Sequence, residues 1–539
     1  MIGCIITKQS FSVKLKLVTE LSLTEMPYQA IKAIGNLLFA ARGSSIDLID
    51  IKNATILSTW TCPLTHSQNH HTASEVESGE RSFNSLGEKN ENSPPVKKRK
   101  LSSEKNNLSD KNLKEAEVLE PTDGKNKGDV YHVESPTVSI LTSTLSGKHI
   151  IIVTGEDKSI RVLEKVGEDQ SQKLIQLSQR VMPKRPCALA LSDDEMTIVS
   201  ADKFGDVYSL PVLHVPSTQS VLQDSEQNLK TFKPAANEFT IHSERNKRAL
   251  ESQRKQKIQS SKKHGSSFDQ KLLLGHVSML TDVKLATVCG RSYVITSDRD
   301  EHIRVSRGIP QTHVIENFCL GHSEFVSKLC IPSTRPTYLI SGGGDDEIFL
   351  WDWRRGDLLS KTNLREHVSN VRRKFSSGEG QSETLDSRLK FAVSGILHLN
   401  EVVNNQSPDL IIISCEGLPA LFTFIFSPEN TLQYSETLWT AGNVLDMSVT
   451  LHQGTRSRTL LVSIDDCHEP GSTSEFRKDD FSNVMPLHQF TVHGRNLKGS
   501  PFEIQMPKDV KAHIEFGKVS DLLYGIENLR KWGDIPQNT

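Results

Sequence analysis

One stretch of ten residues brings acids, bases and an imidazole close enough together to suggest catalysis. In SDRDEHIRVS (297–306), six of seven consecutive residues carry an ionisable side chain. Such a group could be a catalytic cluster of general acids and bases, or it could be the polar turn between two strands. The elements that position these side chains decide between the two interpretations.

Motifs that would hold a substrate or a cofactor are missing from the sequence. The triple glycine of SGGGDDE (341–347) precedes the strand-like run EIFLW and not a helix N-terminus that could receive a phosphate. There is no strand–glycine–helix unit for a nucleotide or S-adenosylmethionine, and no Ser-His-Asp or Cys-His set with local signature residues. The pair His70-His71 lies in a stretch expected to be disordered. The sequence therefore predicts no catalytic residue, no cofactor and no metal site.

The composition excludes a chain whose overall charge attracts polyanions. Its 539 residues include 64 Lys and Arg against 66 Asp and Glu, so any nucleic-acid contact must come from a local patch. The eight cysteines are scattered without a Cys-x-x-Cys pair, as is typical of reduced thiols in an intracellular protein. No apolar run approaches the roughly 18 residues of a membrane span, and the N-terminus lacks a secretory leader. We expect a soluble protein without membrane contact.

Short apolar runs bounded by Gly, Asp, Ser and Pro recur along the chain, with the period and the borders of β-strands. Seven segments show this pattern: 36–51, 149–163, 196–210, 292–306, 337–353, 410–426 and 458–466. The apolar residues after their turns, such as Ile303 and Ile348, are about 45 to 48 residues apart, with one interval doubled by a polar insertion. Units of this length built from short strands are typical of propeller blades.

The segment LISGGGDDEIFLWDW explains why acids gather in these turns. Asp345 lies in the turn, four residues after Ser341 and six before Trp351, with His322 upstream. This arrangement resembles the WD-repeat motif, in which the four side chains form a buried hydrogen-bonded set. A buried acid and imidazole are tolerated only when each has a partner, so these residues are first of all structural. The corresponding positions of the other strand-turn-strand segments are predicted to play the same role; they are His276, Asp300, Asp157 and Asp202.

These features predict an all-β fold, a seven-bladed WD-repeat β-propeller with long disordered insertions. A closed ring of blades leaves no sheet edge exposed. The resemblance to WD-repeat rings implies that the strand near the N-terminus completes the last blade. The predicted divisions are 1–65, first blade and closing strand; 66–130, disordered insertion; 131–213, blades; 214–270, basic insertion; 271–470, blades; and 471–539, closing segment with a short helix.

Two insertions and the C-terminal segment carry further signals. Residues 66–130 have too few large apolar groups to fold, and their basic run of Lys97, Lys98, Arg99 and Lys100 looks like a nuclear import signal, the alternative being a solvated charge cluster. The run ERNKRALESQRKQKIQSSKKHG in 214–270 either touches an RNA backbone or is a solvated insertion. KVSDLLYGIENLRKW predicts an amphipathic helix packed on the ring. We expect the protein in the nucleus.

The resemblance extends beyond a generic WD repeat. Five stretches in consecutive blades are similar to the non-catalytic WD-repeat subunit of the eukaryotic tRNA (guanine-N(7)-)-methyltransferase, in its fungal form. They are ADKFGDVYSL (201–210), GHVSMLTDV (275–283), TSDRDEHIRVSRGIP (296–310), CLGHSEFVSKL (319–329) and SGGGDDEIFLWDW (341–353), and the terminal IENLRKW also looks like the end of that family. The combination is far more specific than any single Gly-His or Trp-Asp pair.

This resemblance implies a protein that performs no chemistry itself. In the family, the WD-repeat subunit forms a heterodimer with a separate catalytic methyltransferase, which binds S-adenosylmethionine and methylates a guanosine in the tRNA variable loop. The WD-repeat subunit holds that partner active and adds basic surface near the tRNA. The family's key contact is a basic residue that falls on Arg304, which pairs with an acid of the partner. Lys203, Arg299 and Glu301 are the neighbouring candidates for partner contact.

Strand alternation is consistent with an outward position for that contact. In SDRDEHIRVS, Ile303 and Val305 point to one side of the strand, while His302 and Arg304 point to the other. Arg161 holds the same offset in an earlier blade, where surface decoration is the default interpretation. We therefore expect one face of this strand to offer charge to a partner.

Two other classes of function remain open at this point. A generic WD-repeat adaptor, such as a substrate receptor of a ubiquitin ligase or a ribosome-assembly scaffold, would share the fold and co-purify with different proteins. An independent hydrolase would require inward-facing acids and metal ligands around the central channel. No such set is visible in the sequence.

Overall fold

The computed structural model describes eleven stretches of the chain. They are residues 20–22, 26–63, 135–168, 171–213, 268–375, 390–400, 409–451, 458–477, 485–493, 496–504 and 513–531. The predicted disordered insertion, the basic run at 97–100, the pair His70-His71 and nearly all of 214–270 lie outside the described residues. Among the described residues, no helix is both long and apolar enough to span a membrane.

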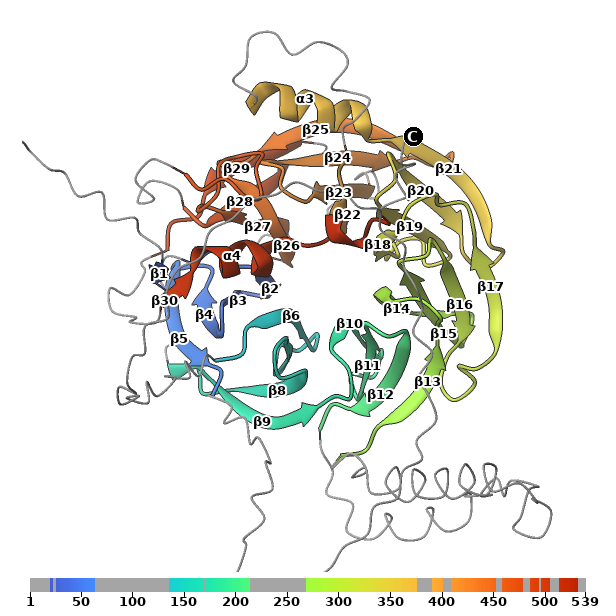
Figure 1. Cartoon of the computed structure of the whole chain (residues 1–539), viewed down its shortest axis with the longest axis horizontal. Coiled ribbons are helices and arrows are strands. Elements are labelled where there is room, and N and C mark those ends of the chain that lie inside the picture. Colours follow the sequence, from blue (N-terminus) through green and yellow to red (C-terminus); the bar gives the residue numbers. More distant parts are fainter. Residues whose placement is uncertain are drawn as a thin grey trace, which may run out of the picture. The chain divides into compact units, whose positions relative to one another are not determined.

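Seven antiparallel sheets of four strands each surround a central space, as Figure 1 shows. Each of these seven sheets is built from four consecutive strands, so the chain completes one blade before it begins the next. Blade 1 contains β2 (Ala30–Ile34), β3 (Leu37–Arg42), β4 (Ser45–Asp50) and β5 (Thr55–Thr61). Blade 2 contains β6 (Val138–Ser143), β7 (His149–Thr154), β8 (Ser159–Val166) and β9 (Lys173–Val181). Blade 3 contains β10 (Pro186–Leu191), β11 (Thr197–Asp202), β12 (Asp206–Pro211) and β13 (Lys271–Gly275).

The remaining four blades follow the same order. Blade 4 contains β14 (Leu280–Val288), β15 (Arg291–Asp298), β16 (Ile303–Arg307) and β17 (Ile315–Cys319). Blade 5 contains β18 (Val326–Cys330), β19 (Tyr338–Gly343), β20 (Glu347–Asp352) and β21 (Asp357–Asn363). Blade 6 contains β22 (Val393–Asn400), β23 (Asp409–Cys415), β24 (Ala420–Phe426) and β25 (Leu432–Trp439). Blade 7 contains β26 (Asn443–Leu451), β27 (Arg458–Asp465), β28 (Leu487–His493) and β29 (Asn496–Pro501). The prediction of a seven-bladed propeller is confirmed.

The hydrophobic core lies between neighbouring blades. In β7, the consecutive residues Ile150 to Val153 are all fully buried, because both faces of a blade pack against adjacent sheets. The outermost strand β9 instead alternates between buried and exposed positions. The seven segments found in the sequence therefore correspond mainly to the second and third strands of each blade, where both faces are apolar.

The ring closes without a shared strand, and the prediction that an N-terminal strand completes the last blade is wrong. All four strands of blade 7 come from the C-terminal part of the chain, and β28 and β29 lie beyond residue 470, where no blade was expected. Blade 1 is joined to blade 7 by side chains: Oδ2 of Asp446 accepts the N–H of Ile31 at 2.8 Å, and Oγ of Ser448 accepts the N–H of Ala33 at 2.8 Å. These bonds satisfy backbone donors of β2, whose other edge pairs with no strand among the described residues.

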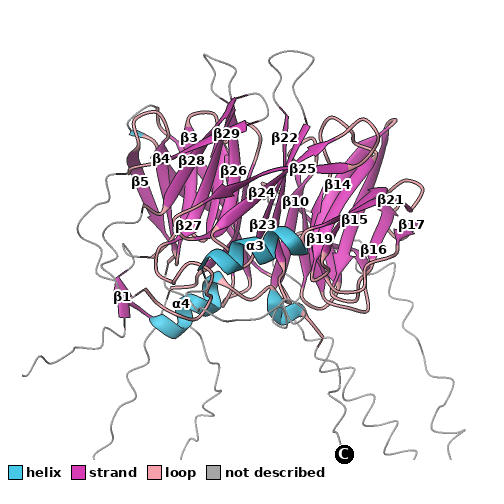
Figure 2. Ribbon diagram, turned by 90° about the horizontal axis from the view of Figure 1, so that it is seen from above, coloured by secondary structure: helices cyan, strands magenta, loops and turns pink. Residues whose placement is uncertain are grey.

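A C-terminal segment, residues 513–531, lies across one end of the ring; we call it the strap. Its β30 (His513–Glu515) pairs with β1 (Glu20–Ser22), and α4 (Phe516–Leu523) and the 3₁₀ helix η5 (Glu527–Leu529) follow. Figures 1 and 2 show α4 beside the ends of the blade strands. Val519 of α4 is fully buried in a cluster with Met26 and Cys467. The predicted helix packed on the ring is present.

A second helix, α3 (Arg365–Phe375), connects blade 5 to the segment that leads into blade 6. Figure 1 shows it outside β25. Its buried Val368 and Val371 join the core between these two blades. The ring of His367 stacks on Tyr434 with 3.9 Å between ring centroids.

The antiparallel order divides the connections between two faces of the ring. The turns from the second to the third strand lie at the same end as the connections from one blade to the next. The strap contacts this end, which we call the strap face. The turns from the first to the second strand and from the third to the fourth lie on the opposite face. SDRDEHIRVS forms such a turn on the strap face, between β15 and β16.

Candidate interaction site

Blade 5 carries a hydrogen-bonded set of His322, Ser341, Asp345 and Trp351. Nδ1 of His322 lies 2.7 Å from Oδ2 of Asp345, and Nε2 lies 2.7 Å from Oγ of Ser341. The indole Nε1 of Trp351 donates to the same hydroxyl at 2.8 Å. Burial lowers the pKa of His322, so the imidazole is neutral and offers one donor and one acceptor. The structure thus brings the four predicted residues together as a tie within the blade.

Blade 4 contains a similar set, but its acid is not the predicted one. Nδ1 of His276 lies 3.0 Å from Oδ2 of Asp298, and Nε2 lies 2.8 Å from Oγ1 of Thr296. Oδ1 of Asp298 accepts the backbone N–H groups of Asp300 and His302 at 2.9 and 3.1 Å. Burial raises the pKa of Asp298, but the hydrogen bonds from His276 and from the His302 amide outweigh it, so the pKa lies below its ordinary value. Asp298 both caps the turn and holds the histidine.

Asp300 was assigned this role by sequence offset, and that assignment is wrong. The two turns are equally long, with 7 positions from Thr296 to Ile303 and 7 from Ser341 to Ile348, but blade 4 carries an acid two positions earlier, Asp298, where blade 5 has Gly343. The side chain of Asp300 is instead half exposed and lies 3.0 Å from Nζ of Lys531 in the strap.

Blade 2 uses an arginine where blades 4 and 5 use a histidine. Asp157 accepts from Oγ1 of Thr154 at 2.5 Å and from Nη2 of Arg161 at 2.6 Å. Arg161 is fully buried, so its interpretation as surface decoration is wrong. Burial raises the pKa of Asp157, yet the hydrogen bonds from Arg161 and Thr154 bring it below its ordinary value. Asp157 ties its blade together with a different cation.

Blade 3 has the predicted acid but lacks the histidine. Oδ1 of Asp202 accepts the N–H groups of Phe204 and Asp206 at 2.7 and 3.0 Å, whereas its buried Oδ2 has no hydrogen-bond partner among the described residues. Burial raises the pKa of Asp202 accordingly. Met182 stands four residues before β10, where His276 and His322 stand before β14 and β18. Asp202 therefore caps its turn without completing the set.

Blade 7 contains a set that the sequence analysis missed. Nδ1 of His468 lies 2.6 Å from Oδ2 of Asp465, and Nε2 lies 2.8 Å from Oγ of Ser520 in the strap. The hydroxyl of Tyr524 donates to the same Asp465 oxygen. This is the order of a Ser-His-Asp triad, but His468 and Asp465 are fully buried and the geometry repeats that of blade 5. The set binds the strap to the ring, and the spacing of Asp and His in IDDCHE was its one sequence signal.

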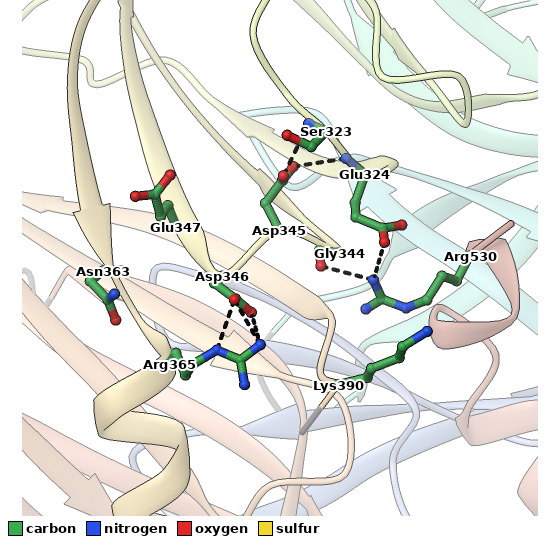
Figure 3. A pocket seen from close by; sticks show the side chains of 10 residues that line it. All are labelled: Ser323, Glu324, Gly344, Asp345, Asp346, Glu347, Asn363, Arg365, Lys390 and Arg530. Carbon is green, nitrogen blue, oxygen red and sulfur yellow. Dashed lines mark hydrogen bonds and ion pairs between the residues drawn. The ribbon is translucent and has the colours of Figure 1, made fainter. Parts of the chain in front are cut away.

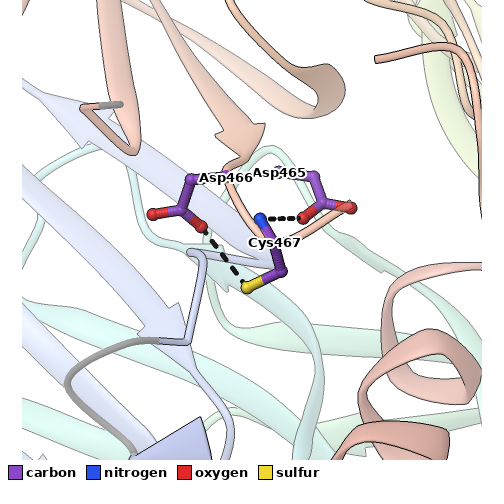
Figure 4. Close-up of side chains that lie close together, drawn as sticks. All are labelled: Asp465, Asp466 and Cys467. Carbon is purple, nitrogen blue, oxygen red and sulfur yellow. Dashed lines mark hydrogen bonds between the residues drawn. The ribbon is translucent and has the colours of Figure 1, made fainter. Parts of the chain in front are cut away.

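Asp465, Asp466 and Cys467 form the one cluster of three potential metal ligands among the described residues (Figure 4). Oδ1 of Asp465 accepts the N–H of Cys467 at 2.8 Å, and its other oxygen belongs to His468 and Tyr524. Burial and the neighbouring Asp465 raise the pKa of Asp466 to about 7. Because Asp465 is already committed to these partners, the cluster is part of the strap attachment and offers no open ligand set.

Acids that face the central channel also serve the ring. Oδ2 of Asp282 accepts the N–H of Leu329 in the next blade at 2.9 Å, as Asp446 does for blade 1. Glu416 accepts three consecutive strap amides, Gly525 to Glu527, at 2.6 to 2.8 Å. The channel pocket, about 370 Å³, is lined on the strap side by residues that include Leu523 and Tyr524. These carboxylates tie blades together and are occupied by backbone amides.

Arg304 is buried, and the expectation of an outward cation is wrong. Its side chain is 9% exposed; Nε donates to Oγ of Ser306 at 2.9 Å and Nη1 donates to the carbonyl of Gly275 at 3.1 Å. Alternation along β16 does point Arg304 away from Ile303, but the adjacent blade 3 covers that side too. Burial lowers the pKa of its guanidinium. Arg304 joins two blades directly beneath the loop that carries His276.

The other three predicted contact residues lie on the strap face. Lys203 is exposed in the turn between β11 and β12. Nε of Arg299 donates to the carbonyl of Leu529 at 2.7 Å, and Glu301 lies 3.0 Å from Nζ of Lys531. The strap therefore holds two of the predicted contact residues, and Lys203 is left open to solvent.

Beside Lys203, the structure reveals an exposed apolar pair that the sequence did not signal. Phe204 is 64% exposed and Val277 is fully exposed. Their loops touch, because the N–H of His276 donates to the carbonyl of Gly205 at 2.8 Å and Gly205 adopts a positive φ of 100°. A side chain at Gly205 would meet the His276 carbonyl, so the close approach requires glycine. This turn pair presents a large apolar group to solvent, as docking surfaces do.

A charged pocket of about 460 Å³ lies farther along the strap face, between blade 5 and Arg530 of the strap (Figure 3). Nη1 of Arg530 lies 2.9 Å from Glu324 and donates to the carbonyl of Gly344 at 3.0 Å. Arg365 forms a bidentate pair with Asp346 at 2.7 and 2.8 Å. Since most charges in the pocket have partners within the chain, it serves to anchor the strap.

Comparison with known proteins gives one consistent result. A family model described as the tRNA methyltransferase TRM82 WD40 domain matches residues 38–490. Three fungal relatives are named tRNA (guanine-N(7)-)-methyltransferase non-catalytic subunit. The Sclerotinia sclerotiorum protein is 43% identical, covering 95% of this chain and 100% of its own. The Coccidioides immitis protein is 38% identical, covering 92% and 95%, and the Phaeosphaeria nodorum protein is 40% identical, covering 73% and 82%.

Proposed function

This chain belongs to the family of tRNA (guanine-N(7)-)-methyltransferase non-catalytic subunits, and from that membership we propose that it binds the catalytic subunit as a heterodimer and stabilises it. The catalytic subunit binds S-adenosylmethionine and transfers the methyl group to guanosine in the tRNA variable loop. This chain supplies a rigid surface for that partner and no reacting group.

The single observation that supports this proposal is the exposed turn pair on the strap face. Phe204 remains 64% exposed, with Nζ of Lys184 4.0 Å from the centre of its ring, and Val277 is fully exposed. Lys203 adds an exposed cation at the edge of this apolar pair. An aromatic anchor beside a charge is the usual composition of a protein-binding hot spot. Both turns are held from below, by Asp202 under Phe204 and by Arg304 under Gly275. A surface fixed in this way loses little conformational entropy on binding.

The test is the affinity of the catalytic subunit for a Phe204→Asp variant. Because Phe204 is solvent-exposed, we expect the ring to keep its stability while binding weakens by about 30-fold or more, the loss expected for a hot-spot aromatic of about 2 kcal/mol. The matched control is Leu145→Asp, an 85% exposed apolar residue in a turn of the opposite face. Isothermal titration with the purified catalytic subunit measures both variants.

The rival function, a generic WD-repeat adaptor, predicts another result. In that case the wild-type chain would not bind the methyltransferase at all, and a ligase linker or pre-ribosomal particles would co-purify with it instead. If Phe204→Asp binds as tightly as the wild-type chain, the turn pair is not the docking surface. Methyl transfer to tRNA with and without this chain then tests the stabilising role separately from the docking surface.

A further inference from the structure

Three of the innermost strands carry a lysine at their middle position. Figure 1 shows these strands, β2, β14 and β18, bordering the central space of the ring. The residues are Lys32 in β2, Lys284 in β14 and Lys328 in β18, and all three are half-buried. We call them the channel lysines. They come from blades 1, 4 and 5, so the ring brings together charges that lie far apart in the sequence.

Two of the channel lysines line the cavity of about 370 Å³ in the central channel. Lys284 and Lys328 form part of its wall, with the polar side chains of Ser139 and Ser394, and Leu523 of the strap borders it. Pockets that bind small molecules have volumes of roughly 300 Å³ and above. The cavity therefore has the size of a site for a small ligand and is too small for a folded partner.

Lys32 belongs to the same electrostatic cluster. Burial lowers its pKa, the carboxylate of Asp446 raises it, and the charge of Lys284 lowers it again. Lys32 and Lys284 come from opposite sides of the central space in Figure 1, so their charges interact through the channel. Like charges at this range repel each other, and an anion placed between them removes that repulsion.

Lys328 occupies a position where two other blades use an acid. In the first strands of blades 4, 5 and 7 the pairing register shifts at a bulge, and the residue after the bulge is Asp282, Lys328 or Asp446. The two acids each accept a backbone amide of the next blade. An ammonium group has only donors and cannot do this. No ion pair or hydrogen bond joins the Lys328 side chain to any residue that the structure describes.

The carboxylates near the channel lysines already have partners. Both oxygens of Asp446 accept backbone amides, each at 2.8 Å, and burial raises the pKa of this acid. Both oxygens of Glu416 accept amides of the strap. Asp282 lies 3.1 Å from Nζ of Lys284, the one ion pair of a channel lysine within the described part of the chain. The channel thus contains ammonium donors in excess of free acceptors.

We propose that this cavity binds a small anion with two linked phosphate groups, held between the channel lysines. Phosphate oxygens accept charge-assisted hydrogen bonds from several amines at once, and lysine contacts them as a point charge that tolerates many directions. Two phosphates offer enough oxygens for donors that come from different blades. The site goes beyond the proposed function and does not depend on it, because its wall includes neither Phe204 nor Val277.

A channel in which water alone solvates the lysines is the competing interpretation. An anion is favoured because the three ammonium groups converge instead of pointing into open solvent, and an unpaired charge in a partly buried site is costly. An acidic peptide of a partner protein is a less suitable occupant, since the strap borders the cavity and restricts entry of a chain.

The experiment titrates the full chain with inorganic pyrophosphate and, in a separate arm, with ADP. Both carry two linked phosphates, but only ADP has a nucleoside, so the arms distinguish an inorganic ligand from a nucleotide. Isothermal titration compares the wild-type chain with the double variant Lys284→Gln and Lys328→Gln. The matched control is Lys173→Gln and Lys271→Gln, which removes two exposed lysines from the outer strands β9 and β13.

We expect the wild-type chain and the control to bind at least one of the two ligands with equal affinity. The double variant should bind that ligand on the order of 100-fold more weakly, about tenfold for each lost charge-assisted hydrogen bond. The ligand should also raise the urea midpoint of the wild-type chain and the control but not that of the double variant, since it binds only the folded ring. Lys328→Arg keeps the charge and should lose less affinity than Lys328→Gln.

The proposal is overturned if the wild-type chain binds neither ligand. Equal affinities of the double variant and the control would place the anion outside the channel and overturn it as well. If the urea midpoint shows that the double variant does not fold, Lys328→Gln alone takes its place, with an expected loss of about tenfold. Binding of the catalytic subunit by the same chains tests the proposed function separately, and its failure would leave the channel site unaffected.

Discussion

At the scale of single residues, the same constellation of atoms can be structural or catalytic, and burial decides which it is. Asp465, His468 and Ser520 have the distances expected of a triad, and so do Asp345, His322 and Ser341. A catalytic serine must reach solvent or substrate, whereas these histidines are buried and both of their nitrogens are occupied. The acids of the opening stretch act in the same way, because Asp298 is committed to His276 and to its own turn.

Arg304 and Lys203 should give opposite results when their charge is reversed. Arg304→Glu would place a carboxylate beside the carbonyl of Gly275 at a site that is 9% exposed, so we expect the free ring to lose about 3 kcal/mol of unfolding free energy. Lys203→Glu changes only an exposed turn and should leave stability within about 0.5 kcal/mol. Urea unfolding of the free chain measures both.

The same two variants distinguish a residue that contacts the catalytic subunit directly, Lys203, from one that supports the docking surface within the ring, Arg304. Lys203→Glu should weaken binding of the catalytic subunit without any change in the urea midpoint. If Arg304→Glu keeps wild-type stability, the guanidinium does not depend on its bonds within the chain, and its assignment as a tie between blades 3 and 4 fails. Arg304 would then remain a candidate for direct contact with the catalytic subunit, as the family resemblance implies.

At the scale of elements, the strap connects blade 7, the last blade, to blade 5. Glu416 caps its 3₁₀ turn, Tyr524 and Ser520 bind blade 7, and Arg530 reaches blade 5. Its β30 also pairs with β1 at the other end of the described chain. In a ring closed without a shared strand, such a bridge replaces part of the missing strand pairing.

Replacement of Arg530 tests this bridge. Arg530→Met keeps the apolar stem over Phe325 but removes the donors to Gly344, Phe391 and Glu324, so we expect a loss of about 2 to 3 kcal/mol in unfolding free energy. Arg373→Met, at an exposed position of α3, is the control and should stay within about 0.5 kcal/mol. Chemical denaturation measures stability, and limited proteolysis reports release of the strap. Equal midpoints for the two variants would mean that the strap carries little of the stability.

The sequence predicted the strands that are buried on both sides and missed most of the others. The second and third strands are apolar on both sides, so 149–163 and 337–353 were visible as strands, whereas the outer strands and α3 were not identified. Alternation placed Arg304 on the side opposite Ile303, but a sequence read strand by strand cannot show that blade 3 covers that side. Asp298 was missed because the turn carries two acids, and the one that bonds His276 lies two positions before the offset that Asp345 holds in blade 5. Phe204 was missed because a lone turn aromatic has no periodicity.

At the scale of the whole molecule, the ring depends on side chains as much as on strand pairing. Asp282 and Asp446 each accept a backbone amide of the next blade, and histidines tie strands within blades 4, 5 and 7. Polar groups buried for structure explain why acids and imidazoles gather in the turns of a chain that belongs to a non-catalytic family. They also make the stability of the ring dependent on pH.

Two opposing titrations set that dependence. Burial lowers the pKa of His322, His398 and His488, so each binds fewer protons when folded; their stabilisation is complete above the unfolded value near 6.5 and is lost as pH falls below it. Asp466 is the reverse case, because burial and Asp465 raise its pKa to about 7. The folded state keeps its proton while the unfolded state releases it, so the stability that Asp466 contributes is lost as pH rises from about 4 to 7.

Substitution of Asp466→Asn isolates the second titration. Asparagine has the shape of the protonated acid without its titration, so we expect equal stability for variant and wild type near pH 4. The variant should become more stable by about 2 kcal/mol at pH 7 and above, since each pKa unit corresponds to about 1.4 kcal/mol and part of the shift is relieved by local relaxation. Urea unfolding of both chains at several pH values between 4 and 8 measures the difference. A stability difference between the two chains that does not depend on pH would mean that Asp466 is ionised in the folded ring. The loss of unfolding free energy below pH 6.5 should occur in both chains, because it comes from the buried histidines.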